Sequence, residues 1–381
     1  MKKNHKKVLV ALSGGVDSSV AAALIKKQGF DVVGIFLKFW QPELPNCQNS
    51  NTCCNFEALH SARSVCQKLK IPFYVDDVRK KFKREVVDYY LKSFFEGITP
   101  NPCVVCNKTI KFGYLIERAK KIGCDFIATG HYARIERKFL NKSQIKDSQT
   151  QIKLLKAKDR KKDQSYFLWQ LNKNELKHIL FPIGNYTKTA VRSLAKKFGL
   201  PTYAKPESQD ICFVPQGKRE EFLQKYAPKL FFSGNVLDTN GKKVGTHNGL
   251  ANYTIGQREK LPVIDYKKMS IIINQHRRQP LYVIKLNAGE NELVIGEKKD
   301  LYHSRLIAEN SNFINLLKYD NLKFTAKIRY GHKPETCKLE VNNKKIKVFF
   351  HKPVRAITPG QSIVFYQGAE LIGGGIIKEY E

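Results

Sequence analysis

The sequence predicts an α/β protein with a parallel sheet domain at its N-terminus, then a small central domain, and a β-barrel at its C-terminus. Three observations predict this order. Strands alternate with helices through roughly the first two hundred residues, a Gly-rich turn joins the first strand directly to the first helix, and short β-rich runs replace this pattern after Phe213. Parallel sheets of this kind carry helices on both faces and bind ligands beyond the carboxyl ends of their strands.

Buried apolar runs predict the strands of the first domain at residues 7–12, 31–39, 73–78 and 125–129. Longer runs with helical spacing predict helices at residues 17–27, 55–69, 82–95, 108–122, 165–171 and 188–198. The last helix ends at Gly199 with Pro201 beyond it, which is a stop signal. Residues 138–162 carry nine Lys or Arg against two Asp, so they form either a solvated hairpin or loop or an arm that faces nucleic acid.

The second half of the chain reads as a β protein. Gly, Pro and Asn turns divide its β-rich runs, which lie at residues 281–286, 292–295, 323–330, 346–350 and 362–366. This pattern indicates a β-barrel that follows a small central domain. We therefore expect three domains, at residues 1–215, 216–285 and 286–381.

Composition narrows the class of protein. The 381 residues include 67 Lys or Arg and 34 Asp or Glu, which gives a net charge of +33. This excess indicates a polyanionic partner such as nucleic acid, although a Lys-rich proteome would also produce it. A hydrophobic fraction of 42% can supply a sizeable core. No apolar run is long enough to span a membrane and no signal-peptide pattern follows the basic start, so we expect a cytoplasmic protein with no membrane partner.

The sharpest motif is Ser13-Gly-Gly-Val-Asp-Ser-Ser19, which lies between the first strand and the first helix. Two glycines permit a tight turn, while the helix N-terminus and the serine hydroxyls supply hydrogen-bond donors for phosphate. The motif lacks the Lys of a Walker loop and the third glycine of a dinucleotide fingerprint. It therefore predicts a phosphate site of another kind.

Cysteines form the second group of candidates. Nine cysteines in a chain without an export signal indicate reduced thiols, a metal site or redox chemistry. Cys103 and Cys106 form a CxxC ahead of a helix expected to start near Lys108, where the helix N-terminus and nearby lysines would lower the pKa of Cys106 and make it a nucleophile. Taken alone, the CxxC also suits zinc, an iron–sulfur cluster or a dithiol switch. Cys212 lies between apolar neighbours, which taken alone favours a core residue.

Motifs recur in a fixed order along nearly the whole chain. They are Ala11-Leu-Ser-Gly-Gly-Val-Asp-Ser-Ser19, Asn101-Pro-Cys-Val-Val-Cys-Asn-Lys108, Ile110-Lys-Phe112, Thr129-Gly-His-Tyr132, Lys162-Asp-Gln-Ser-Tyr-Phe167, Asp210-Ile-Cys-Phe213, Thr254-Ile-Gly-Gln-Arg258, Thr358-Pro-Gly-Gln-Ser362 and Gly373-Gly-Gly375. In this order the chain resembles the bacterial tRNA-specific 2-thiouridylases of the N-type ATP pyrophosphatase superfamily. The resemblance implies a Rossmann-like ATP pyrophosphatase domain, a small central domain and a C-terminal β-barrel that binds tRNA.

The resemblance also implies 2-thiolation of the wobble uridine in the tRNAs for Lys, Glu and Gln, with ATP and Mg²⁺. ATP would contact Ala11, Leu12, Ser13, Gly14, Gly15, Val16, Asp17, Ser18, Leu37 and Gly130, with Mg²⁺ near Asp17. The target base would contact Asn101, Pro102 and Cys103. The tRNA would also contact His131, Lys162, Asp163, Gln164, Arg329, Tyr330 and Gln361.

The implied reaction joins adenylylation to sulfur transfer. ATP converts the uridine oxygen into a good leaving group, and a persulfide on Cys212, loaded by a donor protein, supplies the sulfur. Cys106 is the implied nucleophile, and a Cys106–Cys212 disulfide closes the cycle. Cys103 stands where many members carry an Asp acid or base, and a thiol relays a proton only if its pKa is near the operating pH.

Three other functions fit parts of the sequence. An iron–sulfur enzyme that forms 2-thiocytidine uses CxxC pairs, but a second pair at a suitable spacing is absent. A synthetase-type pyrophosphatase for a small metabolite needs neither a basic barrel nor two cysteines, and a pure RNA-binding module leaves the phosphate loop unexplained. Among the other cysteines, Cys124 and Cys337 are expected in the core. Four match no zinc spacing, namely Cys47, Cys53, Cys54 and Cys66.

Overall fold

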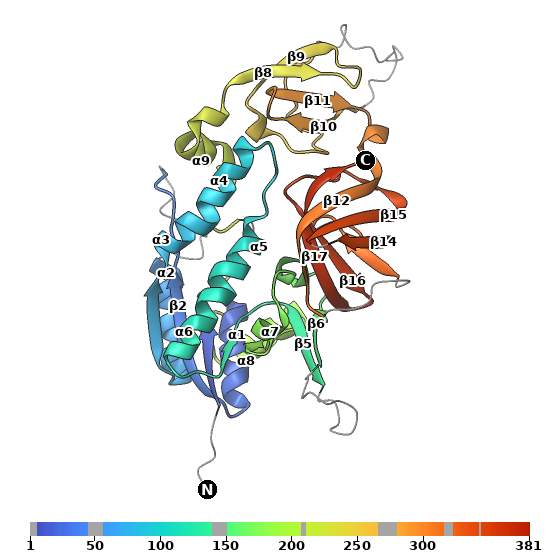
Figure 1. Cartoon of the computed structure of the whole chain (residues 1–381). Coiled ribbons are helices and arrows are strands. Elements are labelled where there is room, and N and C mark those ends of the chain that lie inside the picture. Colours follow the sequence, from blue (N-terminus) through green and yellow to red (C-terminus); the bar gives the residue numbers. More distant parts are fainter. Residues whose placement is uncertain are drawn as a thin grey trace.

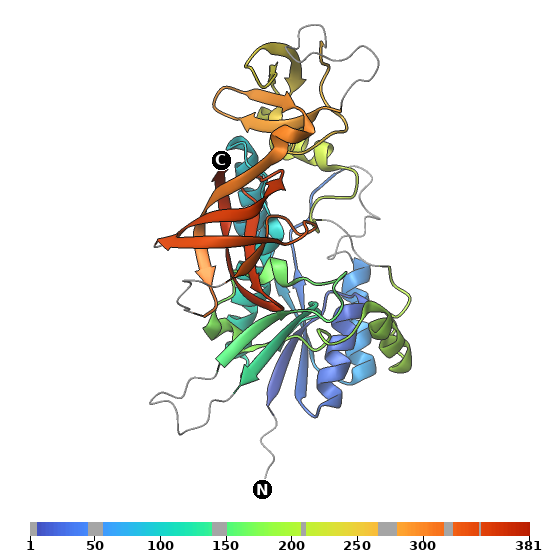
Figure 2. The same ribbon diagram turned by 90° about the vertical axis from the view of Figure 1, so that its right-hand side faces the viewer.

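The computed structural model describes residues 6–44, 56–138, 151–206, 211–265, 280–315, 323–342 and 344–381. These residues form a five-stranded, a four-stranded and an eight-stranded sheet. The five-stranded sheet with its helices lies at one end of the molecule and the four-stranded sheet at the other, with the eight-stranded sheet beside them (Figure 1 and Figure 2). The predicted fold, a parallel sheet domain followed by a central domain and a β-barrel, is confirmed.

The N-terminal sheet is parallel throughout. Its strand order is β3 (Phe73–Asp77), β2 (Asp31–Lys38), β1 (Lys7–Ala11), β4 (Phe126–Ala128) and β7 (Ile179–Leu180). Successive side chains of the central strand point to opposite faces, so Val8 and Val10 pack into one buried cluster and Leu9 into another. Because both faces of β1 are covered, its sequence is a continuous apolar run.

Helices cover the two faces as predicted. One face carries α1 (Val16–Lys27), α2 (Phe56–Leu69) and α8 (Lys188–Lys197). The other face carries two long helical segments, each with a π-helical stretch in its middle. The first consists of α3 (Arg79–Phe82), η1 (Lys83–Val87) and α4 (Asp88–Phe95). The second consists of α5 (Pro102–Cys106), η2 (Asn107–Tyr114) and α6 (Leu115–Lys121).

The second helical segment begins earlier than the sequence analysis predicted. Its first residue is Pro102, so the expected start near Lys108 is wrong. Proline is favoured at the first helical position, because its ring fixes φ in the helical range and its missing N–H would have no intrahelical partner there. Cys103 and Cys106 therefore both lie inside the helix.

The central domain contains a four-stranded sheet. Its strand order is β10 (Tyr282–Asn287), β11 (Glu292–Gly296), β8 (Ser233–Leu237) and β9 (Lys243–Asn248). Val236, Val244 and Val283 are fully buried in its core. The boundary expected between residues 285 and 286 falls inside β10, and the sheet continues to the end of β11. Short helices flank it, namely α9 (Arg219–Tyr226), η4 (Pro228–Leu230), η5 (Leu250–Asn252) and η7 (Lys298–Leu301).

The C-terminal sheet closes into a barrel. Its strands are β12 (Tyr302–Phe313), β15 (Lys345–Arg355), β14 (Glu335–Asn342), β13 (Phe324–Lys327), β16 (Ser362–Gln367) and β17 (Glu370–Tyr380), and pairing between β12 and β17 closes it. The run Gly373–Gly375 lies in β17. A Cβ on Gly373 would come within 2.3 Å of Asn312 O, and one on Gly374 within 2.9 Å of the Trp169 ring. Glycine at these positions thus lets the strand approach its neighbours closely.

A hairpin from the N-terminal half joins the barrel sheet. β5 (Ala133–Lys138) pairs with β6 (Gln151–Lys156), and β6 pairs with β17. Part of the polar stretch at residues 138–162 is therefore a hairpin, whereas residues 139–150 lie outside the described residues. The helix expected at residues 165–171 is a short 3₁₀ helix, η3 (Ser165–Leu168), followed by α7 (Lys173–Leu176). Every helix in the described part of the chain is too short or too polar to cross a membrane.

Candidate active site

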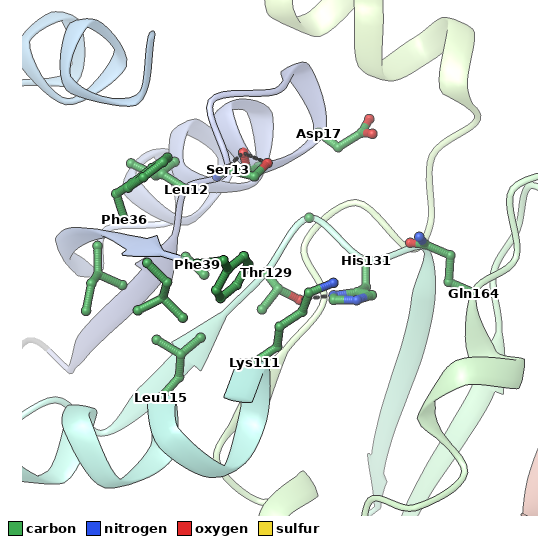
Figure 3. Close-up of a pocket in the computed structure, with 15 residues that line it drawn as sticks. Leu12, Ser13, Asp17, Phe36, Phe39, Lys111, Leu115, Thr129, His131 and Gln164 are labelled. Atoms are coloured by element: carbon green, nitrogen blue, oxygen red, sulfur yellow. Dashed lines mark hydrogen bonds between the residues drawn. The ribbon is translucent and has the colours of Figure 1, made fainter. Parts of the chain in front are cut away.

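A pocket opens at the carboxyl ends of β1, β2 and β4, where the sequence analysis placed the ligand site (Figure 3). Residues at the ends of these strands, in the segments that follow them and in α1 form its walls, together with side chains from η2 and α6. Its lining residues are Ala11, Leu12, Ser13, Asp17, Ser18, Ile35, Phe36, Leu37, Phe39, Lys111, Leu115, Thr129, Gly130, His131 and Gln164.

The Gly-rich turn forms one wall of the pocket and leads into α1. Gly14 has φ +75°, and a Cβ there would come within 2.3 Å of Ala58 O, so no other residue fits. Gly15 caps α1 without a side-chain hydrogen bond, which leaves N–H groups of the first helical turn available for an anion. The hydroxyls of Ser13 and Ser18 lie 3.2 Å apart, and the Ser18 hydroxyl donates to Gly15 O. This turn can cradle a phosphate.

Gly130 brings a second loop against this helix end. A Cβ on Gly130 would lie 2.6 Å from the backbone N of Ser18. The loop after β4 thus approaches α1 closely only because residue 130 has no side chain. The sequence-predicted contacts Gly14, Gly15 and Val16 shape the turn without lining the pocket, while the other predicted ATP contacts line it.

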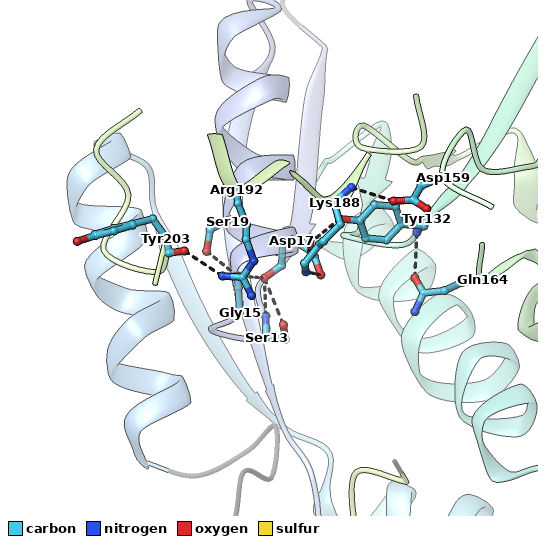
Figure 4. A network of polar contacts seen from close by, with 11 residues as sticks. Ser13, Gly15, Asp17, Ser19, Tyr132, Asp159, Gln164, Lys188, Arg192 and Tyr203 are labelled. Carbon is cyan, nitrogen blue, oxygen red and sulfur yellow. Dashed lines mark hydrogen bonds and ion pairs between the residues drawn. The ribbon is translucent and has the colours of Figure 1, made fainter. Parts of the chain in front are cut away.

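Asp17 lies at the edge of the pocket in a polar network (Figure 4). Lys188 Nζ is 2.8 Å from each carboxylate oxygen of Asp17, and the Tyr132 hydroxyl donates to Asp17 Oδ1 at 2.8 Å. The backbone N of Lys188 donates to Asp159 Oδ2, and that of Tyr132 to Gln164 Oε1. This network joins α1, α8, the segment after β4 and the segment after β6 around the phosphate turn.

The sequence around Lys188 indicates only a helix and gives no sign of a functional role for this residue. The carboxylate contact could not be read from sequence spacing, since 171 residues separate Lys188 from Asp17. Tyr132 stood inside a recognised motif, yet no role was assigned to it. The pocket residues that were missed are Ile35, Phe36, Phe39, Lys111, Leu115 and Thr129.

His131 lies in the floor of the same pocket rather than on an open surface. It is 9% exposed, and its Nδ1 lies 2.8 Å from Thr129 Oγ1. Burial lowers the pKa of His131 well below its usual value, and the positive charge of Lys111 lowers it further. The ring is therefore neutral at pH 7. His131 and Gln164, both predicted as tRNA contacts, thus line the pocket that holds the phosphate turn.

Two of the three cysteines of the predicted sulfur chemistry, Cys103 and Cys106, lie in α5. Cys103 is in its first turn and half-buried, whereas Cys106 ends it and is 4% exposed. Cys212 is half-buried and packs against the apolar cluster that contains Cys106, and the next residue, Phe213, contacts the rings of Phe82 and Tyr90. Cys106 and Cys212 thus both contribute to one extended apolar core.

The surroundings of Cys106 differ from those expected to lower the pKa of its thiol. Because the helix starts at Pro102, the thiol in the first helical turn belongs to Cys103. Lys108, expected to act on Cys106, holds an ion pair with Glu175 at 2.7 Å. Glu175 also forms a capping box with Asn172 at the start of α7, so the charge of Lys108 is engaged in tying α7 to η2.

The remaining described cysteines are buried core residues. Burial raises the pKa of the Cys66 and Cys337 thiols to about 12 and also raises that of Cys124. These thiols are unreactive near neutral pH. Cys47, Cys53 and Cys54 lie outside the described residues. Within the described ranges, no group of three or more His, Cys, Asp or Glu is arranged to hold a metal ion.

The predicted tRNA residues fall at the junction between the first domain and the barrel. Lys162 and Asp163 precede η3, and the Asp163 carboxylate accepts from Ala157 N and from Ser165. Tyr330 is 39% exposed and packs against Phe167 with the two rings tilted and their centroids 4.8 Å apart. Asn101 directly precedes α5, and the buried Tyr166 hydroxyl donates to Ser362 O of the barrel at 2.8 Å.

Arg329 has a structural role that the sequence did not indicate. Its guanidinium donates to Ile255 O of the central domain at 2.7 Å and to the Thr358 hydroxyl of the barrel. Burial lowers its pKa, and its Nε has no hydrogen-bond partner among the described residues. Arg329 thus joins two domains.

Comparison with known proteins decides the family. Three domain models cover the chain: the tRNA methyl transferase HUP domain matches residues 6–216, the tRNA methyl transferase PRC-barrel domain residues 220–297, and the aminomethyltransferase beta-barrel domain residues 303–377. The tRNA-specific 2-thiouridylase MnmA of Carboxydothermus hydrogenoformans is 42% identical over 98% of both chains. The chain belongs to the tRNA-specific 2-thiouridylase family.

Two further relatives in this thiouridylase family match this chain over an equally large share of its length. The proteins named tRNA-specific 2-thiouridylase MnmA from Clostridioides difficile and Clostridium perfringens are 42% and 40% identical over 98% of this chain. The models name methyl transfer, whereas these full-length relatives are named for thiolation. The names of the relatives decide between the two activities, because each relative covers all three domains. The prediction of a tRNA sulfurtransferase family is confirmed.

Proposed function

We propose that this protein uses ATP to thiolate position 2 of the wobble uridine in the tRNAs for Lys, Glu and Gln. The observation that carries the proposal is that one helical segment both carries the CxxC and lines the pocket that contains the phosphate turn. η2 and α6 line the pocket with Lys111 and Leu115, and α5 directly before them carries Cys103 and Cys106. One rigid element thus links the ATP pocket to the sulfur chemistry.

ATP fits the pocket by its chemistry. The apolar residues Ile35, Phe36 and Phe39 suit the adenine ring, while Ser13, Ser18 and the start of α1 suit the phosphates. The uridine oxygen attacks the α-phosphorus, and pyrophosphate leaves. Donors of the turn stabilise the charge that develops on the leaving group.

The donor set also fits a magnesium ion. Asp17 is the carboxylate among the described lining residues, and magnesium binds to one or two carboxylates together with substrate phosphates. A magnesium ion would neutralise phosphate charge. Lys188, which now holds both oxygens of Asp17, would then have its ammonium directed to the phosphates.

The sulfur step uses both cysteines. The terminal sulfur of a Cys212 persulfide attacks C2 of the adenylylated base, and AMP leaves. The thiolate of Cys106 then attacks Cys212 Sγ, which breaks the S–S bond and leaves the electron pair on the sulfur bound to C2. This produces the 2-thiouridine and a Cys106–Cys212 disulfide, which a dithiol reductant reduces. A persulfide donor protein reloads Cys212.

The test is a single-turnover reaction of persulfide-loaded protein with ATP and unmodified tRNA transcripts. Nucleoside mass spectrometry should detect 2-thiouridine in transcripts with an unpaired uridine at the wobble position, and pyrophosphate should be released. A transcript with cytidine at that position is the matched control. Thiolation without ATP, or iron-dependent thiolation by a Cys212→Ser variant, would reject the mechanism.

A further inference from the structure

A barrel loop, residues 358–361, holds the segment that leads into the CxxC helix. Gln361 Nε2 donates to Thr99 O at 3.0 Å and to Pro100 O at 3.2 Å. In the opposite direction, Thr99 N donates to Pro359 O at 3.0 Å. Pro100 lies two residues before α5, which faces the barrel (Figure 1). These hydrogen bonds therefore fix the backbone immediately before Asn101 to the barrel.

The loop is itself rigidly held by the barrel. Gly360 N donates to Ile377 O at 2.9 Å, and Ile377 N donates to Gln361 O at 2.8 Å. Thr358 is 1% exposed and accepts from Arg329, which also donates to the central domain. The loop that hydrogen bonds to Thr99 is therefore itself held in place by hydrogen bonds within the barrel.

Gly360 makes the close approach possible. Its φ is +87°, which favours glycine, and a Cβ there would lie 2.8 Å from Thr99 O and 3.0 Å from the Cβ of Ile98. A side chain at residue 360 would push the two segments apart. Glycine at this position thus has a steric reason that concerns the catalytic segment.

The side-chain amide nitrogen of Gln361 makes both of its hydrogen bonds within this contact. A glutamine amide has two N–H donors, and both carbonyls that they reach belong to the segment before α5. Pro100 and Pro102 cannot donate backbone hydrogen bonds, so this segment has few other means of fixing its path. Only the Oε1 atom of Gln361 remains for an outside partner.

We propose that Gln361 is a positioning residue that sets the place of α5 and its cysteines, in addition to any contact with tRNA. This inference rests on the proposed function. If tRNA binds at this barrel loop, as the proposed function expects, the contact holds the bound nucleotide and the CxxC in a fixed relative position. A misplaced reacting group lowers the rate of a reaction far more than it lowers substrate affinity.

The experiment compares Gln361→Met with the wild type, because Met keeps the side-chain length and removes both donors. Gln367→Ala, at an exposed glutamine of the same barrel, is the matched control. At saturating tRNA and ATP, Gln361→Met should lower the single-turnover rate of thiolation by about 10- to 100-fold, with tRNA affinity changed less than about twofold. Gly360→Ala should produce the same pattern through steric displacement.

A second readout does not depend on tRNA chemistry. In Gln361→Met, hydrogen exchange of the Thr99 amide should become faster, because its bond to Pro359 O loses support, while exchange in β14 and β15 stays as in the wild type. Normal rate and exchange with weakened tRNA binding would overturn the inference and leave only a tRNA contact. Faster exchange in a protein whose wild type makes no 2-thiouridine would instead refute the proposed function alone.

Discussion

Lys188 holds both carboxylate oxygens of Asp17 at 2.8 Å in front of the phosphate turn, although 171 residues separate the two in sequence. The Tyr132 hydroxyl completes the contact at 2.8 Å. The side chain of Lys188 is 11% exposed and that of Asp17 is 31% exposed. The contact places the Lys188 ammonium next to the turn that the proposed function assigns to the phosphates of ATP.

Lys188→Met should lower the rate of pyrophosphate release by about 100-fold, because a cation that stabilises the leaving group is lost. The free energy of unfolding should fall by about 1 kcal/mol or less, since the pair is partly open to solvent. Lys197→Met, at an exposed position of α8, is the control. A rate equal to that of the control would mean that Lys188 serves only to hold Asp17.

Asp17→Asn should abolish adenylylation and leave tRNA binding nearly intact, because the carboxylate acts on metal and pyrophosphate. Pyrophosphate release in the presence of tRNA measures the first effect and filter binding the second. Asp31→Asn, exposed at the start of β2, is the control. Retained pyrophosphate release by Asp17→Asn would contradict the assignment of the phosphate turn.

Cys106→Ser and Cys212→Ser should each eliminate thiolation, since a hydroxyl neither carries sulfane sulfur nor forms a disulfide. Wild-type protein after a single turnover should contain a Cys106–Cys212 cross-linked peptide, detected by mass spectrometry without reductant. Cys124→Ala, at a buried thiol with a raised pKa, should keep its activity. Cys103→Ala should be tolerated better than Cys106→Ala; equal loss would assign Cys103 an essential proton-transfer or nucleophilic role.

Stability should decrease as pH falls below about 6.5, in part through His131. Burial and Lys111 lower its pKa in the folded protein, so the unfolded chain binds the proton more tightly and acid favours unfolding. The stabilisation is fully present above the unfolded pKa and is lost as pH falls toward the folded one. Chemical denaturation of wild type and His131→Gln at pH 7.5 and 5.5 should show a smaller loss in the variant. An equal loss would assign the effect to other histidines, such as His332.

Binding of tRNA should depend steeply on salt, because a net charge of +33 favours many phosphate contacts. Log affinity should fall with log salt with a slope steeper than about −3, and Lys162→Ala should make it shallower by about 0.7 to 0.9. ATP affinity should not change. Arg329→Ala should also loosen the domain junction, so Lys162→Ala is the cleaner variant. A flat salt dependence would argue against phosphate-dominated binding.

Local sequence patterns were sufficient to predict the parallel sheet and its phosphate turn. Val8, Leu9 and Val10 are apolar because both faces of β1 are buried, and the glycines after β1 reflect a backbone conformation and a close approach to Ala58. Each of these requirements restricts the residue type at a single position, so it leaves a readable signal in the sequence. The order of the motifs along the chain indicated the family, which no single element could do.

Long-range contacts left no such signal. Lys188 reads as one more lysine of a helix until folding places it against Asp17, and Gln361 reads as part of a tRNA motif until its amide is found on Thr99 and Pro100. The start of α5 at Pro102 likewise changed which thiol stands in the first helical turn. Hydrogen bonds and ion pairs depend on distances in space, and a chain that folds back on itself sets those distances independently of separation in sequence.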